Sequence, residues 1–126
     1  DLNKIKHILS QKYNMVLFPE GTTSDGFSLL PFKTSLIKAA IETSKALLPV
    51  CIIYKDKDGR KKVKDVIYNS KMNFFKHLYN FIAIKNLSVD VCFLDKIDIS
   101  KNLKRRDISE KAYKMINGVF TGNPAM

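Results

Sequence analysis

The residues best suited to chemistry lie in one stretch that reads Phe-Pro-Glu-Gly-Thr-Thr-Ser-Asp-Gly. Its carboxylate, Glu20, follows a proline that fixes the backbone and precedes Gly21, where the absent side chain lets a ligand approach the main chain. Thr22 and Thr23 add hydroxyl groups, and Lys33 places a cation before a predicted helix whose N-terminus favours an anion. The pattern predicts a polar, anion-tolerant pocket with one carboxylate, although a turn-rich loop without any ligand has the same composition.

The elements around this stretch form a predicted βαβ unit. Apolar residues at helical spacing predict a helix over residues 2–12, and the apolar run 15–18 predicts a buried strand that ends directly before the loop. A second helix is predicted over residues 36–46, and the run 50–54, which follows Pro49, predicts a second strand. Because open α/β sheets bind ligands at the carboxyl ends of their strands, the loop lies where a site is expected.

The second half of the chain continues the α/β pattern. A charged turn at 55–60 contains an Asp-Gly pair typical of hairpins, so the segment 63–68 is expected to pair back. Aromatic residues at helical spacing predict a helix over 74–82, and alternation over 87–93 predicts a strand with one more polar face. A last helix is predicted over 107–117, followed by a frayed tail. The predicted fold is α/β, with a mixed, mostly parallel sheet flanked by helices.

Composition and charge limit the classes of protein. The chain has 126 residues, of which 45% are hydrophobic and 27% charged, so it is one globular domain or part of one. No apolar run approaches the roughly 18 residues of a membrane-spanning helix. The net charge is +10, and residues 55–126 carry +8 of it, which predicts a basic surface. That surface is either simply solvated or contacts an anionic partner, membrane lipid or nucleic acid.

The two cysteines give no sign of a metal site. Cys51 and Cys92 fall in the predicted strands, and neither has a second Cys or a His at metal-ligand spacing. We therefore expect buried, reduced thiols in a cytosolic compartment and no bound metal.

A family resemblance adds to this picture. The Phe-Pro-Glu-Gly-Thr run, followed by Pro-Phe-Lys and a helix with small residues, resembles the third conserved block of the glycerolipid acyltransferases, a group that includes the 1-acylglycerol-3-phosphate acyltransferases. The run 48–54 resembles the fourth block. Looser similarity over 72–81 and 89–93 extends to short bacterial members, including lyso-ornithine lipid acyltransferases. The resemblance implies that residues 1–126 are the C-terminal part of a single acyltransferase domain.

The resemblance also implies an activity. An enzyme of this family moves a fatty acyl group from acyl-carrier protein or coenzyme A to the hydroxyl of a lysolipid, for example lysophosphatidate, and it needs no cofactor. The implied location is peripheral, at the cytoplasmic face of an anionic membrane. Glu20 and Gly21 match positions that help to bind the glycerol-phosphate acceptor, Thr22 completes the motif, and Pro49 matches a position that shapes the acyl and acceptor site.

The acceptor-binding motif departs from the family at one position. Thr23 stands where the family often has an arginine that would contact phosphate. The departure shifts phosphate recognition to Lys33 and to upstream groups, or favours a non-phosphate acceptor such as a lyso-ornithine lipid.

The catalytic His-x-x-x-x-Asp block of the family is not found in the sequence. His7 has Lys12 at the Asp position, and His77 has Ile82 there. No catalytic residue is therefore expected within this chain, which should be inactive alone, and His77 is expected to be a structural, partly buried side chain. Together with the Asp at position 1, this favours a fragment whose catalytic block lies upstream.

Two other interpretations remain for a chain of this composition. A nucleic-acid-binding module would explain the charge, but there is no zinc-ligand spacing and no Gly-rich phosphate loop with a lysine, so nucleic acid is not an expected partner. An inert remnant of a split or decayed gene would also keep these motifs.

Overall fold

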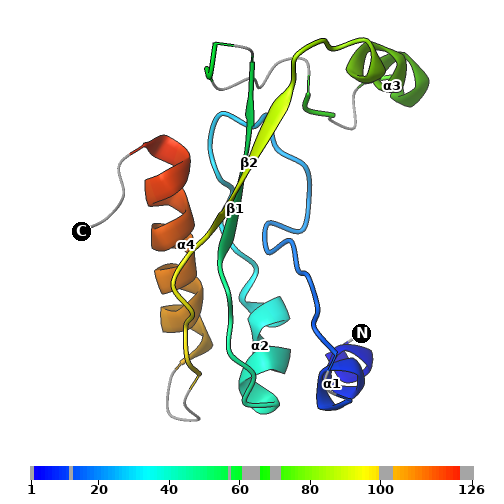
Figure 1. Cartoon of the computed structure of the whole chain (residues 1–126). Helices are drawn as coiled ribbons and strands as arrows, with labels where there is room; N and C mark the ends of the chain where they lie inside the picture. Colours follow the sequence, from blue (N-terminus) through cyan, green and yellow to red (C-terminus); the bar gives the residue numbers. More distant parts are fainter. Residues whose placement is uncertain are drawn as a thin grey trace.

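The fold was analysed in a computed structural model, and the structure describes residues 2–11, 13–56, 58–60, 66–68, 72–99 and 104–122. The elements in chain order are α1 (Leu2–Ser10), α2 (Thr34–Glu42), β1 (Val50–Lys55), α3 (Phe74–Ile82), β2 (Ser88–Phe93) and α4 (Arg105–Thr121). In Figure 1, α4 runs alongside the sheet, α1 and α2 lie near one end of the strands, and α3 lies at the other end.

The two strands pair antiparallel, and this is the one sheet within the described residues. Val50 lies opposite Phe93 and Lys55 opposite Ser88. The predicted strands at 50–54 and 87–93 are therefore confirmed, but the mostly parallel sheet is not. A parallel sheet would have needed a strand at 15–18 beside β1.

The predicted strand at 15–18 is wrong. Residues 13–18 have no strand or helix assignment, and Val16 and Phe18 are 82% and 72% exposed. An apolar run becomes a buried strand only when a neighbouring strand and a packed layer receive it. Neither is present over this run among the described residues, so the βαβ unit is not formed there.

The two faces of the sheet differ in chemistry. Cys51 lies opposite Cys92, and neither forms a disulfide bond. Cys51 is buried as predicted, whereas Cys92 is only half-buried. On the same face, Lys55 forms an ion pair with Asp90. The other face is apolar and largely exposed, and its exposed members are Ile52, Val89, Val91 and Phe93. The prediction that β2 has one more polar face is confirmed.

The main core lies between α2, α4 and the segment that follows β2. Its buried residues are Ile37, Ile97, Ile108 and Ala112. Partly buried neighbours complete it: Phe32, Ile41, Leu47, Ile99 and Met115. Burial of these side chains on both helices fixes the position of α2, and therefore of the loop 19–33 that leads into it.

Three helices end elsewhere than predicted, and α1 ends at Ser10, two residues early. α2 ends at Glu42, four residues earlier than expected, because Ser44 has a left-handed φ of 52° that interrupts the helix. α4 is longer than expected and continues to Thr121, so the frayed tail is wrong over the described residues. Gly118 is buried within the helix, and the terminating glycine is instead Gly122, with φ 76°.

The helix α3 matches its predicted range. Asn73 caps it, since its side chain accepts a 3.1 Å hydrogen bond from the Lys76 amide. The charged turn before it is also confirmed: the Asp56 amide donates to the Arg60 carbonyl at 2.8 Å. The predicted pairing of residues 63–68 falls mostly outside the described residues. None of the described helices is long and apolar enough to cross a membrane.

Candidate functional site

The loop 19–33 is closed at its base by the backbone. The Lys33 amide donates a 2.8 Å hydrogen bond to the Pro19 carbonyl, and the Gly21 amide donates to the Phe18 carbonyl at 3.0 Å. Gly21 has a φ of +67°, a conformation that residues with a Cβ adopt at a cost. The two ends of the loop therefore lie side by side, directly before α2.

Glu20 spans the interior of this loop. Its side chain is half-buried, and Oε2 accepts a 2.8 Å hydrogen bond from the Leu30 amide. A carboxylate that accepts a backbone N–H in this way fixes the path of the chain. Glu20 thus holds the loop in shape, and any contact it makes with a ligand is additional to that role.

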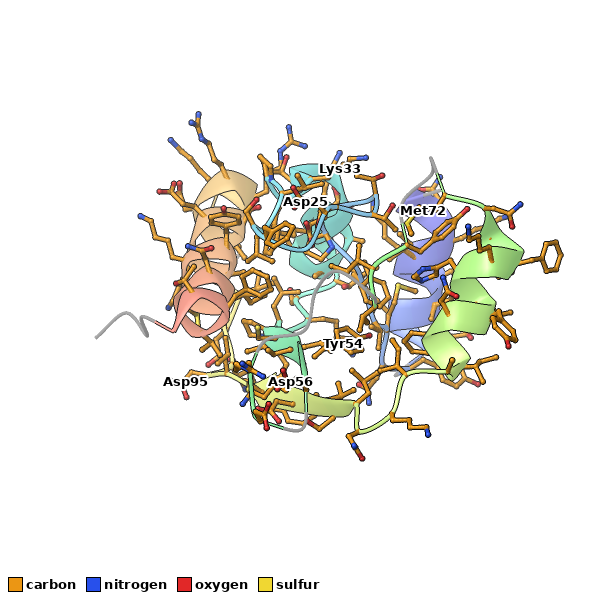
Figure 2. All side chains as sticks on the ribbon, turned by 90° about the horizontal axis from the view of Figure 1, so that it is seen from above. Asp25, Lys33, Tyr54, Asp56, Met72 and Asp95 are labelled. Carbon is orange, nitrogen blue, oxygen red and sulfur yellow. The ribbon has the colours of Figure 1, made fainter. Side chains whose placement is uncertain are left out.

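Lys33 and Gly21 lie against each other. A Cβ placed on Gly21 would be 2.8 Å from the Lys33 Nζ, so the absence of a side chain at Gly21 makes room for the ammonium group. Lys33 is exposed and stands at the N-terminus of α2, where the free amides add to its positive charge. Figure 2 shows Lys33 and Asp25 on one side of the molecule, away from Asp56 and Asp95.

The other predicted site residues lie outside this contact. Thr22 and Thr23 are exposed on the outer part of the loop. Pro49 is buried at the start of β1, and its carbonyl accepts a 3.0 Å hydrogen bond from the Leu94 amide. The structure brings together Gly21 and Lys33, it directs the Glu20 carboxylate to the Leu30 amide, and it places Pro49 directly before β1.

One residue that supports the loop was not predicted from the sequence. The Tyr113 hydroxyl on α4 donates to the Leu29 carbonyl at 3.3 Å. Its ring meets Phe32 edge to face, with centroids 5.2 Å apart. The two hydrogen-bonded residues are 84 positions apart, and no local pattern carries such a contact. Through Tyr113 the core helix α4 supports the loop from below.

The two histidines lie on different helices at opposite ends of the molecule. His7 is exposed on α1, with a ring nitrogen 3.0 Å from the Gln11 amide nitrogen. His77 on α3 is buried, as predicted, beside the rings of Tyr68 and Phe81. His77 lines an open, mostly apolar groove of about 210 Å³, whose other lining residues are Tyr54, Val66, Phe74, Leu78 and Phe81.

Several ionisable groups are perturbed by surface contacts. A hydrogen bond from Lys6 lowers the pKa of Glu42 and joins α1 to α2. A hydrogen bond to Asp90 raises the pKa of Lys55 on the sheet. The described residues contain no group of three or more His, Cys, Asp or Glu side chains placed to hold a metal ion.

Comparison with known proteins places this loop in a family. The family model named Acyltransferase matches residues 2–53, from α1 into β1. The chain is 31% identical over 136 residues to a lyso-ornithine lipid O-acyltransferase of Rhizobium meliloti, covering 96% of this chain and 47% of that protein. The chain belongs to the acyltransferase family.

Two further relatives match most of this chain and less than half of their own length. A 1-acyl-sn-glycerol-3-phosphate acyltransferase of Neisseria gonorrhoeae is 28% identical over 111 residues, which cover 88% of this chain and 43% of that protein. A lyso-ornithine lipid O-acyltransferase of Pseudomonas aeruginosa is 30% identical over 112 residues, covering 89% and 42%. The chain thus spans less than half the length of these curated relatives. No solved structure matches it.

Proposed function

We propose that this chain forms the acceptor-binding part of a glycerolipid acyltransferase of phospholipid biosynthesis. The closed loop 19–33 carries the proposal, because it holds Glu20 and Lys33 beside Gly21 within the segment that the family model matches. In this proposal residues 1–126 are the C-terminal part of one acyltransferase domain. The His-x-x-x-x-Asp block would come from the part of the relatives that lies outside the match.

The proposed reaction is a direct acyl transfer. The hydroxyl oxygen of the lysolipid attacks the thioester carbonyl of an acyl-carrier protein or coenzyme A donor, a base supplied by the His-Asp block takes the proton, and the thiol leaves. The donor carries the acyl group, so this chemistry needs neither a metal nor a bound cofactor. The acceptor is a membrane lipid, so the enzyme would work as a peripheral protein at the cytoplasmic face.

In this scheme the residues of the chain bind and orient the acceptor. Lys33 is the cation for the anionic head group, and the N-terminus of α2 adds to its field. The exposed hydroxyls of Thr22 and Thr23 are available to the glycerol or amide oxygens. Because Thr23 is neutral, Lys33 carries the charge recognition alone in the loop, and both phosphate and carboxylate head groups suit one ammonium.

A binding measurement on the chain tests the acceptor site without turnover. A short-chain lysophosphatidate, used below its micelle concentration, is expected to shift the backbone amide signals of Gly21 and Lys33 in NMR. The Lys33→Met variant should bind it about 10- to 150-fold more weakly, since a charged hydrogen bond is lost. Lys111→Met removes an exposed lysine of α4 and should bind normally. Equal binding of both variants, or of an uncharged monoacylglycerol, would contradict the proposal.

Glu20 separates acceptor binding from loop structure. Glu20→Gln keeps the shape of the side chain and still offers an oxygen to the Leu30 amide, but removes the charge. If Glu20 only fixes the loop, the variant binds the same ligand normally and melts at a slightly lower temperature. If Glu20 also contacts the acceptor, affinity falls more than stability does. A labelled acyl-donor assay is expected to detect no turnover by the chain alone.

A further inference from the structure

The helix α3 carries apolar residues on two different sides. Phe74, His77 and Phe81 face the groove that Tyr54 of β1 helps to line. Phe75, Tyr79 and Ile82 follow the spacing i, i+4, i+7 and so form a stripe along the helix. They are 79%, 76% and 74% exposed. We call these three residues the outer stripe.

The outer stripe is not covered by the rest of the described structure. No other described helix or strand packs closely along α3, which lies at one corner of the molecule in Figure 1. Two aromatic rings and an isoleucine in water are unfavourable unless a partner removes them from it. The stripe is therefore open to a partner, and the charges around it indicate the chemistry of that partner.

The charges around α3 favour an anionic partner. Residues 66–89 contain three lysines and no Asp or Glu, although acidic residues occur on either side of this segment. Lys76 lies on α3 and Lys85 follows it, and both are exposed. A helix with an aromatic and aliphatic stripe, bordered by lysines and free of acids, is the composition of helices that lie in the head-group region of a membrane.

The apolar face of the sheet provides a contrast. Ile52, Val89, Val91 and Phe93 are exposed there without a lysine among them. A flat apolar face without charge suits packing against protein, whereas a convex helix with a cationic border suits a lipid surface.

We propose that α3 docks the protein on an anionic lipid surface, with the outer stripe inserted at the level of the glycerol backbones and with Lys76 and Lys85 at the lipid phosphates. This deepens the proposed function by naming the element that holds the protein to its substrate membrane. It rests on the proposed function in one respect: an enzyme that acts on a membrane lipid is expected to have a membrane as its partner. The acceptor site at Lys33 is a separate surface with a separate test.

The sequence supplies a clean spectroscopic test, because it has no tryptophan. Tyr79→Trp in the full chain gives a single indole on the outer stripe. Vesicles of phosphatidylcholine with phosphatidylglycerol are expected to shift its emission to the blue, and brominated acyl chains should quench it. Pure phosphatidylcholine vesicles should have a much smaller effect, and added salt should reverse the binding. Unchanged emission with anionic vesicles would overturn the proposal.

Matched variants identify the surface in a vesicle flotation assay. Phe75→Ser with Ile82→Ser should weaken binding about tenfold or more, since two exposed apolar side chains are removed. Val91→Ser with Phe93→Ser, which removes two exposed apolar side chains from the sheet face, should have no effect. Circular dichroism checks that each variant stays folded. Equal loss in the Val91 and Phe93 control would mean that binding is not specific to α3, and the proposal would be wrong.

Charge variants complete the test. Lys76→Gln with Lys85→Gln should weaken vesicle binding more than Lys104→Gln with Lys111→Gln, which removes the same charge from exposed positions elsewhere. Equal loss in both pairs would show a general effect of net charge and overturn the proposal. So would vesicle-independent self-association that the Phe75 and Ile82 variant abolishes in light scattering, since the stripe would then be a protein interface. None of these outcomes affects binding of soluble lysophosphatidate at Lys33.

Discussion

The helices α3 and α4 are both amphipathic, yet they use their apolar sides in opposite ways. On α4, Ile108 is 2% exposed and packs with Ala112 into the main core. On α3, Phe75 and Ile82 are 79% and 74% exposed, and no other described helix or strand packs closely along this helix. The periodicity of a helix therefore tells which side is apolar, but not whether protein, lipid or a missing segment covers it.

The same division separates the two proposed surfaces. The loop 19–33 belongs to the packed region, because Tyr113 of α4 contacts both Leu29 and Phe32. The outer stripe belongs to an element with few contacts to that region. Substitutions in the core should thus change the acceptor loop together with overall stability, whereas substitutions on the outer stripe should change docking alone.

The largest expected effect compares two isoleucines. Ile108→Ala should lower the free energy of unfolding by about 2–5 kcal/mol, since it leaves a cavity in the packed core. Ile82→Ala should change it by less than about 0.5 kcal/mol, since that side chain is already in water. Urea denaturation of both variants measures the difference. A similar loss at Ile82 would break the comparison and show that α3 is part of the core.

An intermediate effect compares two glycines with left-handed backbones. Gly21→Ala and Gly59→Ala should each destabilise the chain by about 1–2 kcal/mol, because both positions have positive φ. At Gly21 the added Cβ meets the end of the Lys33 side chain, whereas at Gly59 no atom of a described residue lies within 4 Å of it. NMR signals of the Lys33 ammonium should therefore move in Gly21→Ala alone. If the Lys33 signals do not move, Gly21 does not contact Lys33 and is not part of the site.

The smallest effect concerns how α1 joins the packed region. The hydrogen bond from Lys6 lowers the pKa of Glu42, so this pair contributes stability above the ordinary pKa of a glutamate and loses it as the pH falls through the lowered value. Glu42→Gln should lower the melting temperature slightly at pH 7 and not at strongly acidic pH. Hydrogen exchange in α1 should quicken. Glu110→Gln, which breaks a pair within α4 alone, should leave α1 exchange unchanged.

Hydrophobic spacing and turn residues correctly predicted one helix, both strands and one turn. The helix α3 and both strands lie where spacing and alternation placed them, and the short polar turn at Asp56 follows its Asp-Gly pair. The wrong prediction of a strand at 15–18 shows what an apolar run alone does not determine. Its apolar side chains were identified correctly, but a strand also needs a partner, and the partner is not encoded in the run itself.

The candidate site shows the same limit. Motif and charge identified Glu20, Gly21 and Lys33, and the loop brings Gly21 and Lys33 into contact. The donor of the hydrogen bond to Glu20, the Leu30 amide, lies ten residues further along and has no local sequence signal. Tyr113 could not be found, because its contacts cross most of the length of the chain.

A sheet of two strands also has consequences for behaviour in concentrated solution. In the two-stranded sheet of the described residues each strand is an edge strand, and edge strands accept further strands from other molecules. The run Val-Cys-Ile-Ile-Tyr in β1 has neither charge nor proline and favours extended backbone, which is the composition of segments that stack into cross-β fibrils. Unless a partner covers these edges, fibril growth competes with the folded monomer as the concentration rises.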